Sequence, residues 1–294
     1  MGDFAVEMDN VTYAYPDGYM ALQEVNLSIG IGERVGILGP NGAGKSTLLI
    51  VMNGLYKPLK GTVRVFGRAV TAPGLSGVRQ DVGIVFQDPD DQLFSPTLWE
   101  DVCFGPSNMG LPKEEVRKRS MNALKMVGLD GYEEKPPHHL SAGEKKRAAL
   151  ATVLAMQPRI LVLDEPTANL DPKSRKELIS LLQSLRSDRD MTFVTATHDV
   201  NFLPEAADRV HVLNKGRMIA EGPLREIFSS SKIMDEANLE PPIITQLFKL
   251  FAEKNGISIE SLPFNFEEAV SELSRCCMPE ENKRSRVERG RSRI

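Results

Sequence analysis

The sequence contains no apolar run long enough to cross a lipid bilayer. Its apolar stretches, such as residues 160–163, fall far short of the roughly 20 residues that a transmembrane helix requires. Acidic residues at positions 3, 7 and 9 stand where a secretory signal would have its apolar segment. We therefore expect neither a membrane-embedded chain nor a signal peptide.

Cysteine is also scarce, with Cys103, Cys276 and Cys277 as its only occurrences in 294 residues. Two adjacent cysteines make a poor disulfide and a poor metal site, so the sequence predicts three free thiols and a reducing cytoplasm. The net charge is −4, so the chain as a whole lacks the excess of positive charge that is typical of nucleic-acid-binding proteins. Hydrophobic residues at 41% and charged residues at 26% are typical of an ordinary globular protein and argue against wholesale disorder.

The first half of the chain predicts strands followed by helices. Alternating apolar and polar residues indicate half-buried strands at 4–15 and 21–29, and the more continuously apolar 34–38 suits a buried parallel strand. Residues 61–86 are interpreted as further strands, at 62–66 and 82–86. From about residue 88 to 158 the sequence favours helices, most clearly at 113–127 and 144–156.

The second half returns to alternating strands and helices. We expect strands at 160–163, 191–196 and 209–213, helices at 173–185 and 200–207, and a hairpin arm at 217–221. Pro241 and Pro242 mark a boundary, beyond which two amphipathic pieces follow. Their shared apolar faces comprise Ile243, Ile244, Leu247, Leu250 and Phe251 in one and Phe266, Ala269, Val270 and Leu273 in the other. The Arg-rich segment from Pro279 is predicted to be disordered.

A glycine-rich segment carries the strongest chemical signal. It fits the pattern G-x-x-x-x-G-K-[ST], lies between a predicted strand and a predicted helix, and reads Gly39, Pro40, Asn41, Gly42, Ala43, Gly44, Lys45, Ser46 and Thr47. Glycines let backbone N–H groups turn toward phosphate oxygens, and the helix N-terminus adds a partial positive charge. Lys45 can reach the β- and γ-phosphates, and the Ser46 hydroxyl can ligate Mg²⁺.

Two further segments fit a nucleotide site. An apolar strand at 160–163 ends in Asp164 and Glu165, which delivers carboxylates to the edge of a parallel sheet where ligands bind. Asp164 is expected to hold Mg²⁺ and Glu165 to polarise the attacking water. Ser141 and Glu144 have the spacing of a capping box, and a capped, glycine-containing helix start also suits a phosphate.

These motifs together resemble the nucleotide-binding subunit of an ABC transporter over about residues 3–235. The likeness lies in the phosphate loop, the signature at 140–144 and the acid-tipped strand at 160–165. It implies an α/β fold: a P-loop NTPase core with an N-terminal antiparallel β subdomain and an inserted α-helical subdomain at about 88–158. A small C-terminal helical extension at 236–278 and a disordered basic tail at 279–294 complete the expected domain organisation.

The resemblance also implies roles for single residues. Tyr15 matches the aromatic residue that stacks on adenine, with Tyr13 as its competitor two residues away. Gln87 matches the glutamine that senses Mg²⁺ and links to the membrane subunit, and Asp171 belongs to the loop that crosses to the partner cassette. His198 matches the switch histidine that contacts the γ-phosphate. Glu165, His198, Gln87 and Lys45 are thus the expected catalytic residues, and Ser46, Gln87 and Asp164 the expected Mg²⁺ ligands.

The signature departs from the usual Leu-Ser-Gly-Gly-Gln, because Ala142 and Glu144 replace a glycine and the glutamine. Ser141 and the Gly143 amide are still expected to contact ATP across a dimer. Ala142 adds a methyl group where the backbone must approach closely, and Glu144 adds a negative charge near a triphosphate.

Residues 85–106 resemble one group within this family more specifically, the ATPase subunits of energy-coupling-factor importers. Within that group the resemblance is strongest to the cobalt/nickel type. It implies a MgATP-hydrolysing subunit at the cytoplasmic face of the membrane, working with a second cassette, identical or paralogous, and with integral membrane subunits. Vitamin uptake is the alternative within transport. A non-transport ABC ATPase acting on nucleic acid or ribosomes is the alternative of another class, supported only by the basic tail; no nucleic-acid partner is expected.

Overall fold

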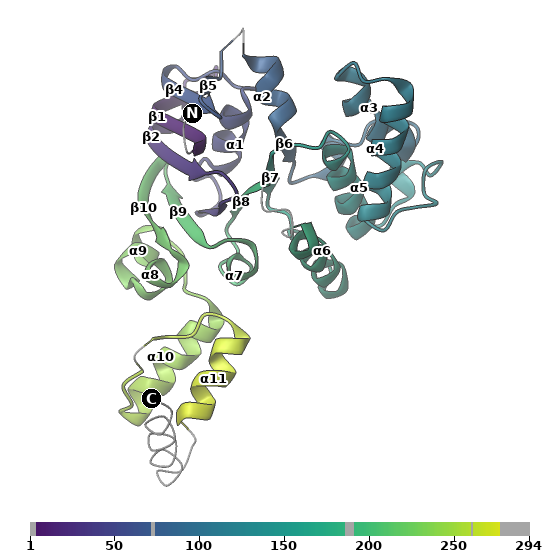
Figure 1. Ribbon diagram of the computed structural model, residues 1–294. Coiled ribbons are helices and arrows are strands. Elements are labelled where there is room, and N and C mark those ends of the chain that lie inside the picture. Colours follow the sequence, from purple (N-terminus) through teal and green to yellow (C-terminus); the bar gives the residue numbers. More distant parts are fainter. Residues whose placement is uncertain (1–3, 72–73, 186–190, 260, 277–294) are drawn as a thin grey trace, which may run out of the picture.

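The computed structural model describes residues 4–71, 74–185, 191–259 and 261–276 (Figure 1). The predicted disordered tail, Cys277 and the side chain of Cys276 lie outside these residues, whereas Cys103 is a free, partly buried thiol. Within the described part of the chain, none of the helices combines the length and the apolar character needed to span a bilayer.

Two sheets form the framework. A four-stranded antiparallel sheet has the strand order β2 (Met20–Gly30), β1 (Phe4–Ala14), β4 (Lys60–Val65) and β5 (Arg68–Ala69). A six-stranded sheet has the order β10 (Arg217–Pro223), β9 (Arg209–Asn214), β3 (Arg34–Leu38), β8 (Thr192–Thr197), β7 (Ile160–Asp164) and β6 (Val82–Val85). All its pairings are parallel except that of β10 with β9. The predicted α/β P-loop fold is confirmed.

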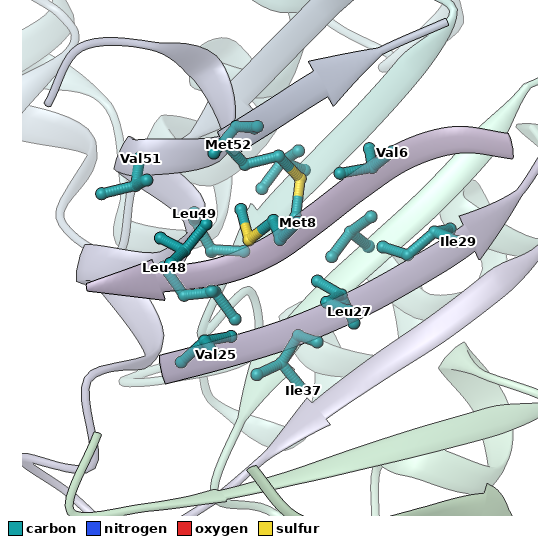
Figure 2. Close-up of a cluster of buried hydrophobic side chains, with 14 of the residues drawn as sticks. Val6, Met8, Val25, Leu27, Ile29, Ile37, Leu48, Leu49, Val51 and Met52 are labelled. Atoms are coloured by element: carbon teal, nitrogen blue, oxygen red, sulfur yellow. The ribbon is translucent and has the colours of Figure 1, made fainter. Parts of the chain in front are cut away.

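Helix α1 (Lys45–Asn53) lies between the two sheets. Its buried side chains Leu48, Leu49 and Met52 meet Val6 and Met8 of β1, as Figure 2 shows. Val25, Leu27 and Ile29 of β2 and Ile37 of β3 belong to the same cluster. Burying such side chains contributes about 1.5–3 kcal/mol each, so this core fixes α1 and the phosphate loop at its start.

The segment between β6 and β7 is mainly helical and projects to one side of the sheets (Figure 1). It contains η1 (Pro89–Asp91), α3 (Leu98–Asn108), α4 (Lys113–Met126), η2 (Pro137–His139) and α5 (Ala142–Leu154). Two helices follow the next strands, α6 (Pro172–Leu185) and α7 (Leu203–Ala206), the latter shorter than the predicted 200–207.

Sequence interpretation missed three helices. The region at 61–86, interpreted as strands, contains α2 (Leu75–Asp81), whose buried Val78 lies one turn from Leu75. Such i, i+3 spacing is helical, but it is too short a signal to outweigh the neighbouring strands. Helices α8 (Leu224–Ser229) and α9 (Ser231–Glu236) follow the hairpin.

The C-terminal part contains the two expected helices, α10 (Ile243–Asn255) and α11 (Phe266–Cys276), which lie beyond α8 and α9 in Figure 1. Helix α10 buries Thr245 and Phe248, and it leaves most of the predicted apolar face exposed, with Ile243 at 68% and Leu247 at 60%. Arg225 connects α8 to the C-terminal helices, because its guanidinium lies 2.8 Å from the Glu268 carboxylate of α11 and also contacts Ser261.

His211 is a fully buried side chain of β9, and it gives the fold a defined pH dependence. Burial, together with the nearby Arg209 cation, lowers its pKa from 6.5 to about 4, although Glu221 and Glu33 oppose the shift. Its Nδ1 lies 3.2 Å from Glu221 Oε2, yet neither ring nitrogen has a hydrogen-bond partner among the described residues.

We therefore expect His211 to lower the stability of the folded protein at acid pH. The unfolded chain takes up the proton below pH 6.5, whereas the folded chain resists it until about pH 4. The contribution is fully present above pH 6.5, and about 3 kcal/mol of unfolding free energy is lost as the pH falls to 4. Denaturant unfolding at a series of pH values checks this against His211→Leu, which should show a flatter dependence in that window. Parallel curves would contradict it.

Candidate functional site

The phosphate loop connects β3 to α1 at the carboxyl edge of the parallel sheet. Gly44 has φ +104°, and a Cβ built there would lie 2.6 Å from the Ala21 carbonyl oxygen. Only glycine meets both requirements without strain. The loop therefore presents backbone N–H groups and the start of α1, which together favour an anion.

Lys45 is held within this loop. Its Nζ donates to the carbonyl oxygens of Gly39 at 2.8 Å and Pro40 at 3.2 Å, and lies 3.3 Å from Glu165 Oε1. The side chain is only 6% exposed. A buried ammonium group close to backbone carbonyls and a carboxylate is positioned to exchange these contacts for phosphate oxygens.

Glu165 follows β7 and is equally buried. One carboxylate oxygen accepts from Thr197 Oγ1 at 2.8 Å; the other accepts from the His198 backbone N–H at 3.0 Å and lies 2.7 Å from His198 Nδ1. Neighbouring strands β7 and β8 thus bring together Glu165 and His198, two of the four predicted catalytic residues. His198 itself is exposed and pairs directly with Glu165, a contact that the sequence did not predict.

Asp164 and Ser46 lie side by side beneath the loop. Burial, reinforced by the charge of Glu165, raises the pKa of Asp164, while a hydrogen bond from Ser46 and the cations Lys45 and Lys146 oppose the rise. Asp164 Oδ1 has no hydrogen-bond partner among the described residues. An unpaired buried carboxylate oxygen beside a hydroxyl fits the oxygen ligands that Mg²⁺ prefers.

A depression of about 430 Å³ runs along the loop and extends to Tyr15 and Tyr19. Tyr15 is half-buried and bonds Thr47 through its hydroxyl at 2.8 Å, whereas Tyr13 is buried and stacked against Tyr56. Only Tyr15 of the two candidates lines the depression. Gln87 and Glu165 reach its other end, while the exposed Tyr19 is a lining residue that the sequence interpretation missed.

Ser141, Gly143 and Asp171 lie apart from this depression, where α5 meets α6. Ser141 and Glu144 form the predicted capping box, with Glu144 Oε2 accepting from the Ser141 N–H at 2.7 Å. This hydrogen bond, with a second from the Ser141 hydroxyl, lowers the pKa of Glu144. A Cβ at Gly143 would lie 2.5 Å from Ser174 Oγ, so glycine permits the close approach of α6.

Asp171 caps the start of α6. Its carboxylate accepts from the backbone N–H groups of Lys173 and Ser174 and from the Ser174 hydroxyl. The bonds from Ser174 lower the pKa of Asp171. The residue thus has a local structural role besides the predicted one.

Lys146 is a buried residue that sequence interpretation missed. Its Nζ donates to the Gln87 carbonyl at 2.6 Å and the Glu165 carbonyl at 3.3 Å. Burial lowers its pKa, although Asp164, Asp88 and Glu165 lie near enough to oppose the shift. Across the described ranges, no group of three or more His, Cys, Asp and Glu side chains is arranged to hold a metal ion.

The sequence of this chain is similar to those of known ATP-binding proteins. The sequence profile of the ABC transporter family matches residues 22–168. The energy-coupling factor transporter ATP-binding protein EcfA of Methanocaldococcus jannaschii is 48% identical over 259 residues, 87% of this chain and 92% of the relative. EcfA of Carboxydothermus hydrogenoformans is 46% identical over 267 residues, covering 91% of this chain and 96% of the relative.

The fold is also similar to solved structures of ATP-binding cassettes. CbiO1 from Clostridium perfringens, described as part of the ABC transporter complex cbiONQ, has a TM-score of 0.71 and 41% identity over 85% of this chain and 99% of its own. The ATP-binding cassette MJ0796, solved as a dimer after hydrolysis with ADP and Pi, has a TM-score of 0.66 and 34% identity over 75% of this chain and 99% of its own. The chain belongs to the ABC transporter family as an ATPase of the energy-coupling factor type.

Proposed function

We propose that this chain hydrolyses MgATP within a two-cassette assembly and thereby powers a membrane importer for cobalt or nickel ions. Lys45, Ser46, Asp164, Glu165 and His198 supply one half of each ATP site. Ser141 and Gly143 of the second cassette supply the other half, and Asp171 lies at the crossing between them. The observation that carries the proposal is that Lys45 and Glu165 are buried together beside the depression along the phosphate loop, whereas neither Ser141 nor Gly143 of the same chain lines that depression.

In this proposal Ser46, Asp164 and Gln87 would hold Mg²⁺, which would neutralise charge on the phosphates. Lys45 binds the β- and γ-phosphates, and Tyr15 stacks on the adenine. Glu165 accepts the proton of the attacking water. His198, bonded to the Glu165 carboxylate, orients that carboxylate and contacts the γ-phosphate.

The membrane partner is proposed to dock in a groove beside the same site, which places the chain at the cytoplasmic face of the membrane. The groove has a volume of about 730 Å³ between α2 and α3, and Phe86, Phe94, Phe104, Met109 and Met156 give it an apolar lining. Phe94 and Phe104 pack edge to face and are 65% and 51% exposed. Such exposed aromatic residues are typical of interaction surfaces.

Cross-linking tests this docking. In a chain whose three cysteines are replaced by serine, cysteines at Asp90 and Phe94 are expected to capture an integral membrane subunit from native membranes. Gln92 is a poorer position, because its side chain bonds Ala149 and Thr152 of α5. A cysteine at exposed Glu114 of α4 serves as the control and should capture none. Capture of nucleic acid or ribosomal protein would favour the non-transport alternative.

The choice of cobalt or nickel rests on the sequence likeness at 85–106. Vesicles containing the chain and its membrane subunits should accumulate labelled Co²⁺ or Ni²⁺ when MgATP is supplied. A chain carrying Lys45→Ala should abolish that uptake. Accumulation of a labelled vitamin in place of the metal ions would support the vitamin importer instead.

A further inference from the structure

Lys146 connects two segments of the site through their backbones. It lies in the second turn of α5 with 4% exposure, and its Nζ bridges the carbonyl oxygens of Gln87 and Glu165. These carbonyls follow β6 and β7, which are adjacent strands. One ammonium group therefore holds together the ends of two strands that each deliver a predicted functional residue.

The backbone of Glu165 needs such support. Its φ of +43° lies in the left-handed region, which costs a non-glycine residue about 1–2 kcal/mol. Its N–H donates to the Ala196 carbonyl at 2.9 Å, and its carbonyl accepts from the Ala168 N–H at 3.1 Å and from Lys146 Nζ at 3.3 Å. The backbone of Glu165 is thus held on both sides of its Cα, and these contacts set the point from which its carboxylate reaches Thr197 and His198.

A neighbouring lysine provides a matched comparison. Lys145 also reaches the loop after β6, where its Nζ lies 2.6 Å from Asp90 Oδ1. This ion pair is on the surface, with the Asp90 side chain 60% exposed. Among the residues that the structure describes, Lys145 makes no hydrogen bond or ion pair with the Glu165 segment. An exposed pair of this kind contributes little. The two lysines share a helix and a loop, and they differ in the contact with Glu165.

We propose that Lys146 is a positioning residue for ATP hydrolysis, which sets the direction of the Glu165 carboxylate and ties it to the Gln87 segment beside the partner groove. The inference rests on the proposed role of Glu165 as the acceptor of the water proton. Lys146 acts through this backbone and does not need to touch ATP.

Steady-state ATPase kinetics of the full chain test the inference. Lys146→Met should lower kcat by roughly 10- to 100-fold, as expected when a reacting group is misplaced by about 1 Å, while KM for ATP changes less than about threefold. Lys146→Arg should restore most of the rate, because it keeps a charged donor and Lys146 borders a depression of about 560 Å³. Lys145→Met should stay within about twofold of the native rate.

A double-mutant cycle separates positioning from a general structural role. In a Glu165→Gln chain the carboxylate is already lost, so adding Lys146→Met should change the residual rate less than about twofold. Equal losses in both backgrounds would overturn the inference, as would a native rate for Lys146→Met or a large rise in KM. Should the methionine variant not fold, Lys146→Gln, whose amide is uncharged and one bond shorter than the lysine side chain, takes its place with the same criteria. A native rate for Glu165→Gln alone would instead overturn the proposed role of Glu165, and the inference with it.

Discussion

A Glu165→Gln variant is expected to bind MgATP, to hydrolyse it at least about 100-fold more slowly than the native chain, and to accumulate as a closed dimer. Glutamine keeps the shape of the side chain, but it lacks the carboxylate that accepts a proton from water, and general-base contributions are about 10²–10⁴-fold. ATP bound between Lys45 of one cassette and Ser141 of the other then holds the two together. Light scattering during size exclusion, with and without MgATP, measures the shift.

The closed dimer should disappear when Ser141→Arg is added to the same chain. The arginine side chain is larger and lacks the serine hydroxyl, and it stands where the second cassette must approach. ATP binding at Lys45 of the same chain should be unaffected. Because Ser141 is also a helix cap, a matched control is Ser230→Arg, which removes the cap of α9 away from the site. A Glu165→Gln chain that binds ATP but never dimerises, even with its natural partner cassette, would contradict the shared site.

Lys45→Ala is expected to weaken ATP binding by roughly 10- to 100-fold, since a hydrogen bond to a charged group contributes about 1.5–3 kcal/mol, and to reduce turnover to background. The substitution also removes the cation 3.3 Å from the buried Glu165 carboxylate, so thermal unfolding should be followed alongside. Fluorescent-nucleotide titration and phosphate release measure the two effects. Lys118→Ala, on the exposed surface of α4, is the control. ATPase activity close to native in Lys45→Ala would refute the phosphate-loop assignment.

Much of the site was predictable because its residues follow strongly apolar strands. The strand at 34–38 and the motif after it placed Lys45 and Ser46, and the strand at 160–163 placed Asp164 and Glu165. Parallel strands bring such loops to one sheet edge whatever their separation in the chain. The local capping chemistry of Ser141 and Glu144 was equally visible, since it depends on a spacing of three residues.

Contacts between distant segments were not predictable in the same way. The Glu165–His198 bond depends on the pairing of β7 with β8, and the Lys146 bridge depends on how α5 packs beneath two strand ends. One signal for Lys146 was nevertheless present: it shares a helical face with Ala149, Leu150 and Val153, which are all buried. A lysine on a buried face requires buried acceptors.

The two expected C-terminal helices are present, but the sequence did not indicate which side of α10 is buried. An apolar face at 3.6-residue spacing normally predicts the buried side of a helix. In α10 the described contacts instead bury Phe248 and Thr245, with Thr245 Oγ1 donating to the Pro263 carbonyl at 2.8 Å. Periodicity identifies the helix and its apolar face, but not which face the rest of the chain covers.

The strand order of the six-stranded sheet has a consequence for biosynthesis. Strand β3, which carries the phosphate loop, lies between β8 and β9, and the ribosome makes both only after everything from Gly39 to Met191 has emerged. At about 5–20 residues per second, the nascent chain waits roughly 10–30 s before β3 gains both neighbours. During that interval the apolar strand has unpaired edges on both sides, so the newly made protein is most exposed to aggregation before the step that completes its nucleotide site.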